Sequence, residues 1–460
     1  MAVQRGHFHG AQTVIAGKDL TMAQIDARGD TLFERAGRPH IPALDGLRGI
    51  AVLMVMWLHF VFLSPRTGGE RVFWQLSETG WIGVDLFFVL SGFLITGILY
   101  DAKGGPHYFR NFYMRRSLRI FPLYYAFLIV IFAVIPLLRT SPADHIGKQV
   151  WMWTYLSNVL FARAGWEGMP AHTTHLWSLA IEEQFYLLWP LLVWLASRRR
   201  LIQLCLGSIA VAIGTRLVLH FVAGNDIAAY ALMPARIDAL AAGGLLAVLV
   251  RDREGARLAA KYLNPVAAGS AIVLILVMFW SGPVKGLSML PTLDFPVQTF
   301  GYPALALFFA AMLGKAVAAP AGHVATRVLT SRTLMAFGKY SYALYLVHIL
   351  VRDILQNQIL ANRGGFPVIV GSQLPAQLAM VAFGIGVSYA IAFASWHLFE
   401  KRILALKRFF PYERVRVSKA GVTAEPPVSV AAGADLGSLS SNAPPRATSV
   451  ALIEEGSGGR

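Results

Sequence analysis

The sequence predicts an all-α polytopic membrane protein with about ten transmembrane helices, one short re-entrant or interfacial segment, and both termini in the cytoplasm. Hydrophobic residues make up 56% of the 460 residues and charged residues only 14%, whereas soluble domains carry about 25% charged residues. Apolar runs of about 17 to 25 residues, the length that a bilayer requires, recur along most of the chain. Basic residues cluster between these runs, as is typical of cytoplasmic loops.

The apolar segments are expected along the whole middle of the chain. They cover residues 47–63, 80–100, 118–138, 150–161, 176–196, 201–223, 227–250, 263–280, 298–319, 334–356 and 376–399. The segment 150–161 is too short to span a bilayer, and its Trp and Tyr side chains suit a membrane interface. When this segment is not counted as a span, every basic cluster falls on one side, which is then the cytoplasmic side.

The two ends of the chain differ from the middle. Residues 1–40 are polar, with no basic stretch leading into an apolar one, so we expect a cytoplasmic extension and no cleaved signal peptide. Residues 404–460 are first basic and then rich in Ala, Gly, Pro and Ser, which predicts a disordered cytoplasmic tail. The membrane domain is therefore expected at 41–403. The single Cys205 excludes an internal disulfide.

The first predicted span, LDGLRGIAVLMVMWLHF, carries Asp45, Arg48 and His59. Charged and titratable groups are costly in hydrocarbon, so each is expected to have a function or a buried partner. Eleven helical residues place His59 about 16 Å from Arg48 along the helix axis. Eleven steps of about 100° nearly complete three turns, so the three side chains share one face. The alternative for His59 is a structural histidine bonded to a neighbouring carbonyl.

A second arrangement is HLWSLAIEEQFYLLWP, in the span after the short segment. Its Ser178, Glu182 and Tyr186 follow at intervals of four residues and therefore form one stripe on a helix. This span is expected to run inward from the outer face, which places Glu182 at a depth similar to that of His59. The alternative is that Glu182 forms an ion pair with Arg216 or Arg236 and holds helices together.

A third arrangement is YFRNFYMRRSLRIFPLYY, with Arg115, Arg116 and Arg119 at the cytoplasmic entry of the third span. Guanidinium groups match the geometry of phosphate, so these arginines are candidates for binding an anionic ligand from the cytoplasm. Basic residues at the inner end of a span are also the ordinary signal of topology. Both interpretations remain open from the residues alone.

Further polar groups lie in the remaining spans, and most are expected at middle or outer depths. They are Asp85, Arg216, His220, Arg236, Asp238 and His348. A water-containing cavity open to the outer face would accommodate them, although Asp85, Arg236 and Asp238 also suit structural ion pairs.

The sequence offers little evidence of other catalytic motifs. A phosphate-binding loop, a zinc-binding HExxH pair and a nucleophile elbow are absent from the sequence, and no metal site is expected. His40–Asp45 and His348–Asp353 have the spacing of a histidine–aspartate pair used by some acyltransferases. The second pair falls on different faces of a helix and the first contains a proline, so we interpret both as coincidence.

With these motifs the chain resembles the acyltransferase 3 family of integral membrane proteins over about 41–403. The matching stretches are LDGLRGIAVLMVMWLH, with ten residues between the arginine and the histidine, GWIGVDLFFVLSGFLI, RRSLRIFPLYY, HLWSLAIEEQFYLLWP, RIDALAAG, YSYALYLVH and SWHLFEK. The last stretch continues with Arg402 where the family pattern often has proline. A C-terminal hydrolase-like domain, which some members carry, is not recognised here.

The resemblance implies transfer of an acetyl or other short acyl group from cytoplasmic acyl-CoA, most simply acetyl-CoA, to a hydroxyl of a glycan or small molecule. The expected partners are this donor, the acceptor and membrane lipids, and nucleic acid is not among them. A bacterial inner membrane is the expected location. The alternative functions are a transporter of a glycan or lipid-linked substrate, and a scaffold or sensor without chemistry.

Acyl transfer to a hydroxyl requires a base and the alignment of two substrates. We assign His59 as the general base and Glu182 as the group that orients His59 or binds the acceptor. The supporting residues are expected to be Asp45, Ser178, Tyr186, Asp85, Arg236 and Asp238. The phosphates of coenzyme A are expected to bind to Arg48, Arg115, Arg116 and Arg119.

Overall fold

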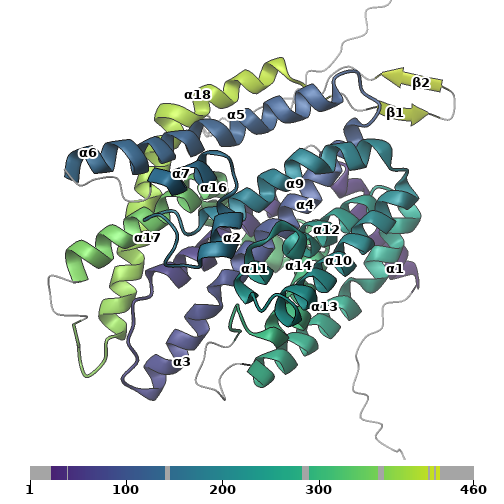
Figure 1. The fold of residues 1–460 in the computed structure, drawn as a ribbon. Helices are drawn as coiled ribbons and strands as arrows, with labels where there is room; N and C mark the ends of the chain where they lie inside the picture. Colours follow the sequence, from purple (N-terminus) through teal and green to yellow (C-terminus); the bar gives the residue numbers. More distant parts are fainter. Residues whose placement is uncertain are drawn as a thin grey trace, which may run out of the picture.

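The computed structural model describes residues 22–38, 40–139, 146–281, 290–360, 367–412, 415–418 and 421–424. These residues form a helical bundle (Figure 1). Within them, nine helical stretches are long and apolar enough to cross a membrane: Pro42–Phe60, Gly68–Ala102, Tyr108–Leu137, Arg198–Phe221, Asp226–Leu249, Arg253–Ser281, Val297–Ala318, Arg332–Asn357 and Leu374–Phe409. The prediction of an all-α polytopic membrane protein is confirmed.

One predicted span, 176–196, is not among these nine stretches. It corresponds to the helix α9 (Leu176–Leu195), which has 20 residues. Its Glu182, Glu183 and Gln184 make it less apolar than the nine other stretches, although its length suits a membrane span. Because many of the side chains at its centre are buried, these polar residues face protein rather than lipid.

In the first half of the chain the helices are α1 (Met22–Ala36), α2 (Pro42–Phe60), α3 (Gly68–Ser77), η1 (Glu78–Trp81), α4 (Ile82–Ala102), α5 (Tyr108–Ile129), η2 (Val130–Val134), α6 (Ile135–Arg139), α7 (Ile146–Trp153), α8 (Ser157–Ala164), α9 and α10 (Arg198–Phe221). In the second half they are α11 (Asp226–Ala231), α12 (Met233–Leu249), α13 (Arg253–Ser281), η4 (Val297–Gly301), α14 (Tyr302–Ala318), α15 (Val324–Leu329), α16 (Arg332–Ile354), η5 (Leu355–Leu360), α17 (Leu374–Ser395), η7 (Trp396–Glu400), α18 (Lys401–Leu404) and η8 (Ala405–Phe409). The labels η mark 3₁₀ or π turns.

The helices α2 and α16 approach each other very closely. A Cβ atom on Gly338 of α16 would lie 1.9 Å from the Asp45 carbonyl oxygen, and one on Gly49 of α2 would lie 2.2 Å from the Leu334 carbonyl oxygen. Glycines on both helices therefore permit the backbones to touch, which is the usual means of close packing in membranes. This contact fixes α2, with Arg48 and His59, against α16.

The short segment predicted at 150–161 does not span the membrane. It forms two eight-residue helices, α7 and α8, separated by a turn in which Tyr155 adopts a positive φ of 56°. Tyr155 does not lie at an interface, because its buried ring stacks on Tyr124 of α5 with ring centroids 4.2 Å apart. The Gln184 side chain donates a hydrogen bond of 3.1 Å to the Tyr155 carbonyl. The turn therefore packs against α5 and α9.

The structure places a helix, α1, in the part of the chain predicted to be a polar extension. The residues of one face are buried, including Leu32 and Ala36, and α1 packs against α13 and α14. Asp30 forms an ion pair with Arg257 of α13 at 3.5 Å. The apolar residues of α1 are few and spaced at helical intervals among charges, so composition alone did not predict this helix.

The chain also remains helical beyond the predicted end of the last span. α17 continues through η7, α18 and η8 to Phe409. Two short strands, β1 (Val415–Ser418) and β2 (Gly421–Ala424), then pair in antiparallel fashion. Figure 1 shows α18 beside α5 at the top of the view. The rest of the predicted disordered tail lies outside the described residues.

Candidate active site

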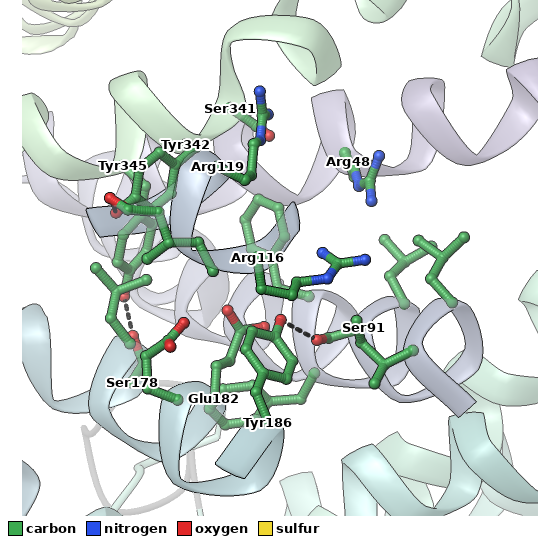
Figure 2. Close-up of a pocket in the computed structure, with 18 of the residues that line it drawn as sticks. Arg48, Ser91, Arg116, Arg119, Ser178, Glu182, Tyr186, Ser341, Tyr342 and Tyr345 are labelled. Atoms are coloured by element: carbon green, nitrogen blue, oxygen red, sulfur yellow. Dashed lines mark hydrogen bonds between the residues drawn. The ribbon is translucent and has the colours of Figure 1, made fainter. Parts of the chain in front are cut away.

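A cavity of about 130 Å³ lies between α2, α4, α5, α9 and α16. Its polar lining side chains are Arg48, Ser91, Arg116, Arg119, Ser178, Glu182, Glu183, Tyr186, Ser341, Tyr342 and Tyr345. Figure 2 shows three guanidinium groups on one side of the cavity and two hydrogen-bonded serine–tyrosine pairs on the other. The cavity therefore brings together two of the arrangements that the sequence predicts, the arginines of α5 and the polar stripe of α9.

The stripe on α9 lies on one face, as its spacing predicts. Ser178, Glu182 and Tyr186 all line the cavity. The Tyr186 hydroxyl shares a hydrogen bond of 2.5 Å with the Ser91 hydroxyl of α4. Glu182 lies at the cavity wall, and none of the described ion pairs involves its carboxylate. The alternative in which Glu182 pairs with Arg216 or Arg236 is therefore wrong.

One end of the cavity, here called the arginine end, is formed by Arg48, Arg116 and Arg119. Arg48 forms an ion pair with Asp45 at 3.2 Å. The Arg116 guanidinium lies 5.7 Å from the centroid of the Tyr186 ring. Within the described part of the chain, neither Arg116 nor Arg119 has a carboxylate at ion-pair distance. Guanidinium groups that are not neutralised by carboxylates suit the binding of an anion.

Arg115 has a different position from its neighbours in sequence. Its guanidinium donates hydrogen bonds to the carbonyls of Lys407 at 3.0 Å and Phe410 at 3.1 Å. It also lies 4.7 Å from the centroid of the Tyr412 ring, and it does not line the cavity. Arg115 therefore holds the segment after α18 against α5.

His59 belongs to a cluster of three histidines, here called the histidine cluster. Its ring centroid lies 4.9 Å from that of His348 on α16, which in turn lies 5.1 Å from that of His175 at the start of α9. Nδ1 of His59 bonds to the Val55 carbonyl at 2.8 Å, and Nδ1 of His348 bonds to the Tyr345 carbonyl at 2.7 Å. Nε2 of His348 and both ring nitrogens of His175 are buried, and no hydrogen-bond partner for them is found in the described part of the chain.

Unpartnered buried imidazole nitrogens are unusual, because the loss of hydration is not offset. The bond of Nδ1 to a carbonyl, predicted as the structural alternative for His59, is present in the structure. It leaves Nε2 of His59 as the nitrogen available for chemistry. His175 and His348 were not assigned to the site from the sequence, although both fall within the stretches HLWSLAIEEQFYLLWP and YSYALYLVH.

Tyr345 lies between the cavity and the histidine cluster. Its hydroxyl shares a hydrogen bond of 2.5 Å with the Ser178 hydroxyl and lies 3.2 Å from the His175 carbonyl. Its ring centroid lies 5.4 Å from those of His175 and His348. His59 does not line the cavity, and no hydrogen bond joins it to Glu182 among the described residues. The expected orientation of His59 by Glu182 is therefore not seen in this conformation.

The other predicted supporting residues lie away from the cavity. Asp85 of α4 and Arg236 of α12 form an ion pair at 2.7 Å, and Arg216 of α10 pairs with Asp238 of α12 at 2.8 Å. All four side chains are almost completely buried, and none lines the cavity. The Arg236 guanidinium also lies 3.9 Å from the centroid of the Tyr302 ring. These pairs join α4, α10 and α12 as a structural unit.

The two histidine–aspartate spacings have different outcomes. Nε2 of His40 bonds to the Asp45 carboxylate at 2.7 Å, so this first pair forms a contact at the surface beside Arg48. In the second pair, Asp353 bonds instead to Nδ1 of His172 at 2.7 Å. The first pair is therefore in contact, and the interpretation that its match to an acyltransferase motif is a coincidence stays a prediction. A group of side chains suited to holding a metal is not found within the described ranges.

A family model described as an acyltransferase domain matches residues 41–396. The peptidoglycan O-acetyltransferase OatA of Listeria monocytogenes is 28% identical over 344 residues, which cover 68% of this chain and 50% of that protein. The O-acetyltransferase OatA of Staphylococcus aureus (strain NCTC 8325 / PS 47) is 28% identical over 333 residues, or 67% of this chain and 50% of that protein.

The chain thus spans about half the length of the curated relatives that it matches. No solved structure matches the chain.

Proposed function

The chain belongs to the acyltransferase 3 family, and from this premise we propose that it is a membrane-embedded O-acetyltransferase that acetylates hydroxyl groups of a glycan. The proposed donor is a cytoplasmic acyl-CoA, most simply acetyl-CoA. The relatives named as O-acetyltransferases, one of them for peptidoglycan, support a cell-wall glycan as the acceptor. The single observation that carries the proposal is a cavity with arginines at one end and hydroxyl and carboxyl groups at the other.

In the proposed binding mode, the phosphates of coenzyme A lie at the arginine end. Arg48, Arg116 and Arg119 supply the charge-assisted hydrogen bonds, which are about twice as strong as neutral ones. The extended pantetheine arm then follows the cavity toward Ser178 and Glu182. The axial distance from Arg48 to His59 is about 16 Å on one continuous helix. An extended arm of this kind can bridge such a distance.

In the proposed chemical step, the acceptor oxygen attacks the thioester carbonyl carbon. Nε2 of His59 takes the hydroxyl proton, the C–S bond breaks, and the departing coenzyme A thiolate is protonated to the free thiol. A neutral imidazole is suited to this role, because its ordinary pKa is close to neutrality. His348, in ring contact with His59, limits the orientations of the imidazole.

The proposed acceptor enters from the histidine end, so the acyl group has to pass Tyr345. Tyr345 and Ser178 both line the cavity and are joined by a hydrogen bond at the side that faces the histidine cluster. We therefore propose that transfer includes rotation of the Tyr345 side chain away from Ser178. Glu182, at the cavity wall, is proposed to position the thioester rather than to contact His59 directly.

A first experiment compares purified wild-type protein with His59→Ala and His397→Ala. His397 is the matched control, because its Nδ1 also bonds to the carbonyl four residues earlier, at 2.9 Å, but its side chain is exposed. Each protein is incubated with acetyl-labelled acetyl-CoA and peptidoglycan fragments, and label in the glycan and free thiol are measured. We expect transfer by wild type and His397→Ala, and a loss of at least about 100-fold for His59→Ala.

Two outcomes would contradict the proposal. Full activity of His59→Ala would remove the proposed base from the mechanism. Absence of both acetyl-CoA binding and transfer in the wild-type protein would contradict the proposed donor.

A further inference from the structure

The segment after α18, residues 405–412, lies against the part of α5 that carries the arginines. Three side chains of α5 contact it. The Asn111 side chain donates a hydrogen bond of 2.6 Å to the Pro411 carbonyl, and Arg115 bonds to two further carbonyls of the segment. The Arg110 guanidinium lies 5.6 Å from the centroid of the Phe410 ring. The segment is therefore fixed at the arginine end of the cavity by bonds to its backbone.

These bonds hold the backbone of Lys407 beside the part of α5 that carries the arginines, although the Lys407 side chain is not among those that line the cavity. Its own carbonyl accepts the hydrogen bond from Arg115, which directly precedes Arg116 in α5. Its side chain is partly buried and interacts electrostatically with four cations, which are Arg119, Arg116, Arg115 and Arg48. No carboxylate lies at ion-pair distance from Lys407 in the described part of the chain. Lys407 thus adds a further positive charge to a group that is already cationic.

Most of this charge is not neutralised by ion pairs. Within the described ranges, Arg48 is the one member of this group with a carboxylate at ion-pair distance, that of Asp45. Glu400 interacts electrostatically with Arg119, but its carboxylate is bonded to Ser395. Like charges repel one another, and the repulsion is strongest where water is partly excluded. A ligand that carries several negative charges would offset this repulsion.

We propose that Lys407 is a donor-binding residue, which contacts the phosphate groups of a thioester donor at the arginine end of the cavity. This inference rests on the proposed function and extends it to a part of the chain after the last predicted span. The ligand class is a nucleotide thioester with more than one phosphate, as in an acyl-CoA, which carries a diphosphate and a separate 3′-phosphate. Asn111 and Arg115 act as positioning residues, because their side chains hold the backbone of residues 405–412, which includes Lys407.

The inference predicts that the contribution of Lys407 depends on the phosphates of the ligand. Full-length protein in detergent is used to measure the dissociation constants of acetyl-CoA and of S-acetyl-pantetheine, which lacks phosphate. For Lys407→Ala we expect acetyl-CoA to bind about tenfold more weakly, as for loss of one charge-assisted contact. The affinity for S-acetyl-pantetheine should remain within about twofold of the wild-type value. Lys407→Arg should retain most of the affinity for acetyl-CoA.

Arg408→Ala is the matched control. Arg408 lies next to Lys407, has the same charge, and is exposed with its guanidinium 4.8 Å from the Phe409 ring centroid. Its substitution should leave both affinities unchanged. A Lys407→Ala protein that loses affinity equally for both ligands would overturn the inference, because a structural role of Lys407 would then explain the loss. Lys407→Gln, which keeps the length of the side chain nearly constant, repeats the test if Lys407→Ala does not fold.

Acetyl-CoA binding by the wild-type protein distinguishes a failure of this inference from a failure of the proposed function. If wild-type protein binds acetyl-CoA and Lys407→Ala and Lys407→Gln bind it equally well, only the role of Lys407 is wrong. If wild-type protein does not bind acetyl-CoA at all, both the donor and the role of Lys407 are wrong.

Discussion

At the scale of single residues, Tyr345 separates the two chemically different parts of the site. Its hydroxyl contacts Ser178 on the side of the cavity and the His175 carbonyl on the side of the histidine cluster. The Ser178 hydroxyl also donates to the His175 carbonyl at 3.1 Å. Removal of the Tyr345 hydroxyl therefore leaves Ser178 with a partner. For this reason Tyr345→Phe tests whether the Tyr345 hydroxyl restricts passage between the cavity and the histidine cluster, without leaving an unsatisfied buried group.

We expect Tyr345→Phe to leave the dissociation constant of acetyl-CoA unchanged and to speed consumption of the thioester by about fivefold. The physical reason is that one hydrogen bond, with a net value of about 1 kcal/mol, no longer opposes the rotation of the ring. Release of free thiol under single-turnover conditions measures the rate. Tyr342→Phe is the control, because this hydroxyl also lines the cavity but bonds to the Ile120 carbonyl. Slower consumption by Tyr345→Phe would indicate that the hydroxyl takes part in the reaction itself.

The residues of the site differ in how far sequence reasoning could predict them. The stripe of Ser178, Glu182 and Tyr186 follows from helical spacing alone, and the structure places all three on one cavity wall. The histidine cluster was not predicted, because His59 in α2, His348 in α16 and His175 just before α9 are far apart in the sequence and are brought together only by the packing of these helices. The position of Arg115 was also missed, since nothing in the sequence shows that α5 packs against residues 405–412.

At the scale of elements, apolar length predicted the spans well. The amphipathic α1 was missed, since its apolar face is narrow and flanked by charge. The turn between α7 and α8 was predicted as a short segment, but its packing against α5 and α9 depends on tertiary contacts such as that between Tyr155 and Tyr124. The sequence therefore does not predict the position of an element that is buried only because a neighbouring helix packs against it.

The pair α2 and α16 provides a test of packing at this scale. Gly338→Ala places a Cβ atom 1.9 Å from the Asp45 carbonyl oxygen, so the two helices have to move apart. We expect a loss of stability of at least about 1–3 kcal/mol, as for other overpacked sites. Because Arg48 follows Asp45 by less than one turn, the affinity for acetyl-CoA should fall as well. Thermal unfolding in detergent and ligand binding measure the two effects.

The control for Gly338→Ala is Gly386→Ala in α17. A Cβ atom on Gly386 has no other atom within 4 Å, and alanine favours a helix by up to about 1 kcal/mol relative to glycine. Gly386→Ala should therefore leave stability unchanged or raise it slightly. Equal stability of the Gly338→Ala and Gly386→Ala proteins would contradict the close contact between α2 and α16.

At the scale of the whole molecule, α4 takes part both in the buried ion pairs and in the wall of the cavity. The buried ion pairs Asp85–Arg236 and Arg216–Asp238 connect α4, α10 and α12. Loss of one member of such a pair is strongly destabilising, by about 3–5 kcal/mol, because the other charge remains buried. These charges were predicted as possible supporting residues or structural pairs, and the structure favours the second role. The site itself lies at the contacts of α4 with α2, α5, α9 and α16.

The proposed mechanism requires the arginine end to face the cytoplasm, so the orientation of the molecule in the membrane is a direct test of it. The chain has a single cysteine, Cys205, which is buried. In a Cys205→Ser background, cysteine is introduced either at Gly69, in the first turn of α3, or at Gly322, between α14 and α15. Both positions are exposed, and a Cβ atom there would have no other atom within 4 Å, so neither substitution should disturb the fold.

Gly69 follows α2 on the side of His59, and Gly322 lies shortly before α15, which packs against α2 near Gly46. In intact cells we therefore expect a membrane-impermeant maleimide to label Gly69→Cys and not Gly322→Cys. After permeabilisation both proteins should be labelled, which shows that both thiols react. The reverse pattern in intact cells would place the arginines on the outer side, where a cytoplasmic acyl-CoA cannot reach them. That result would leave the fold intact and would contradict the proposed direction of acyl transfer.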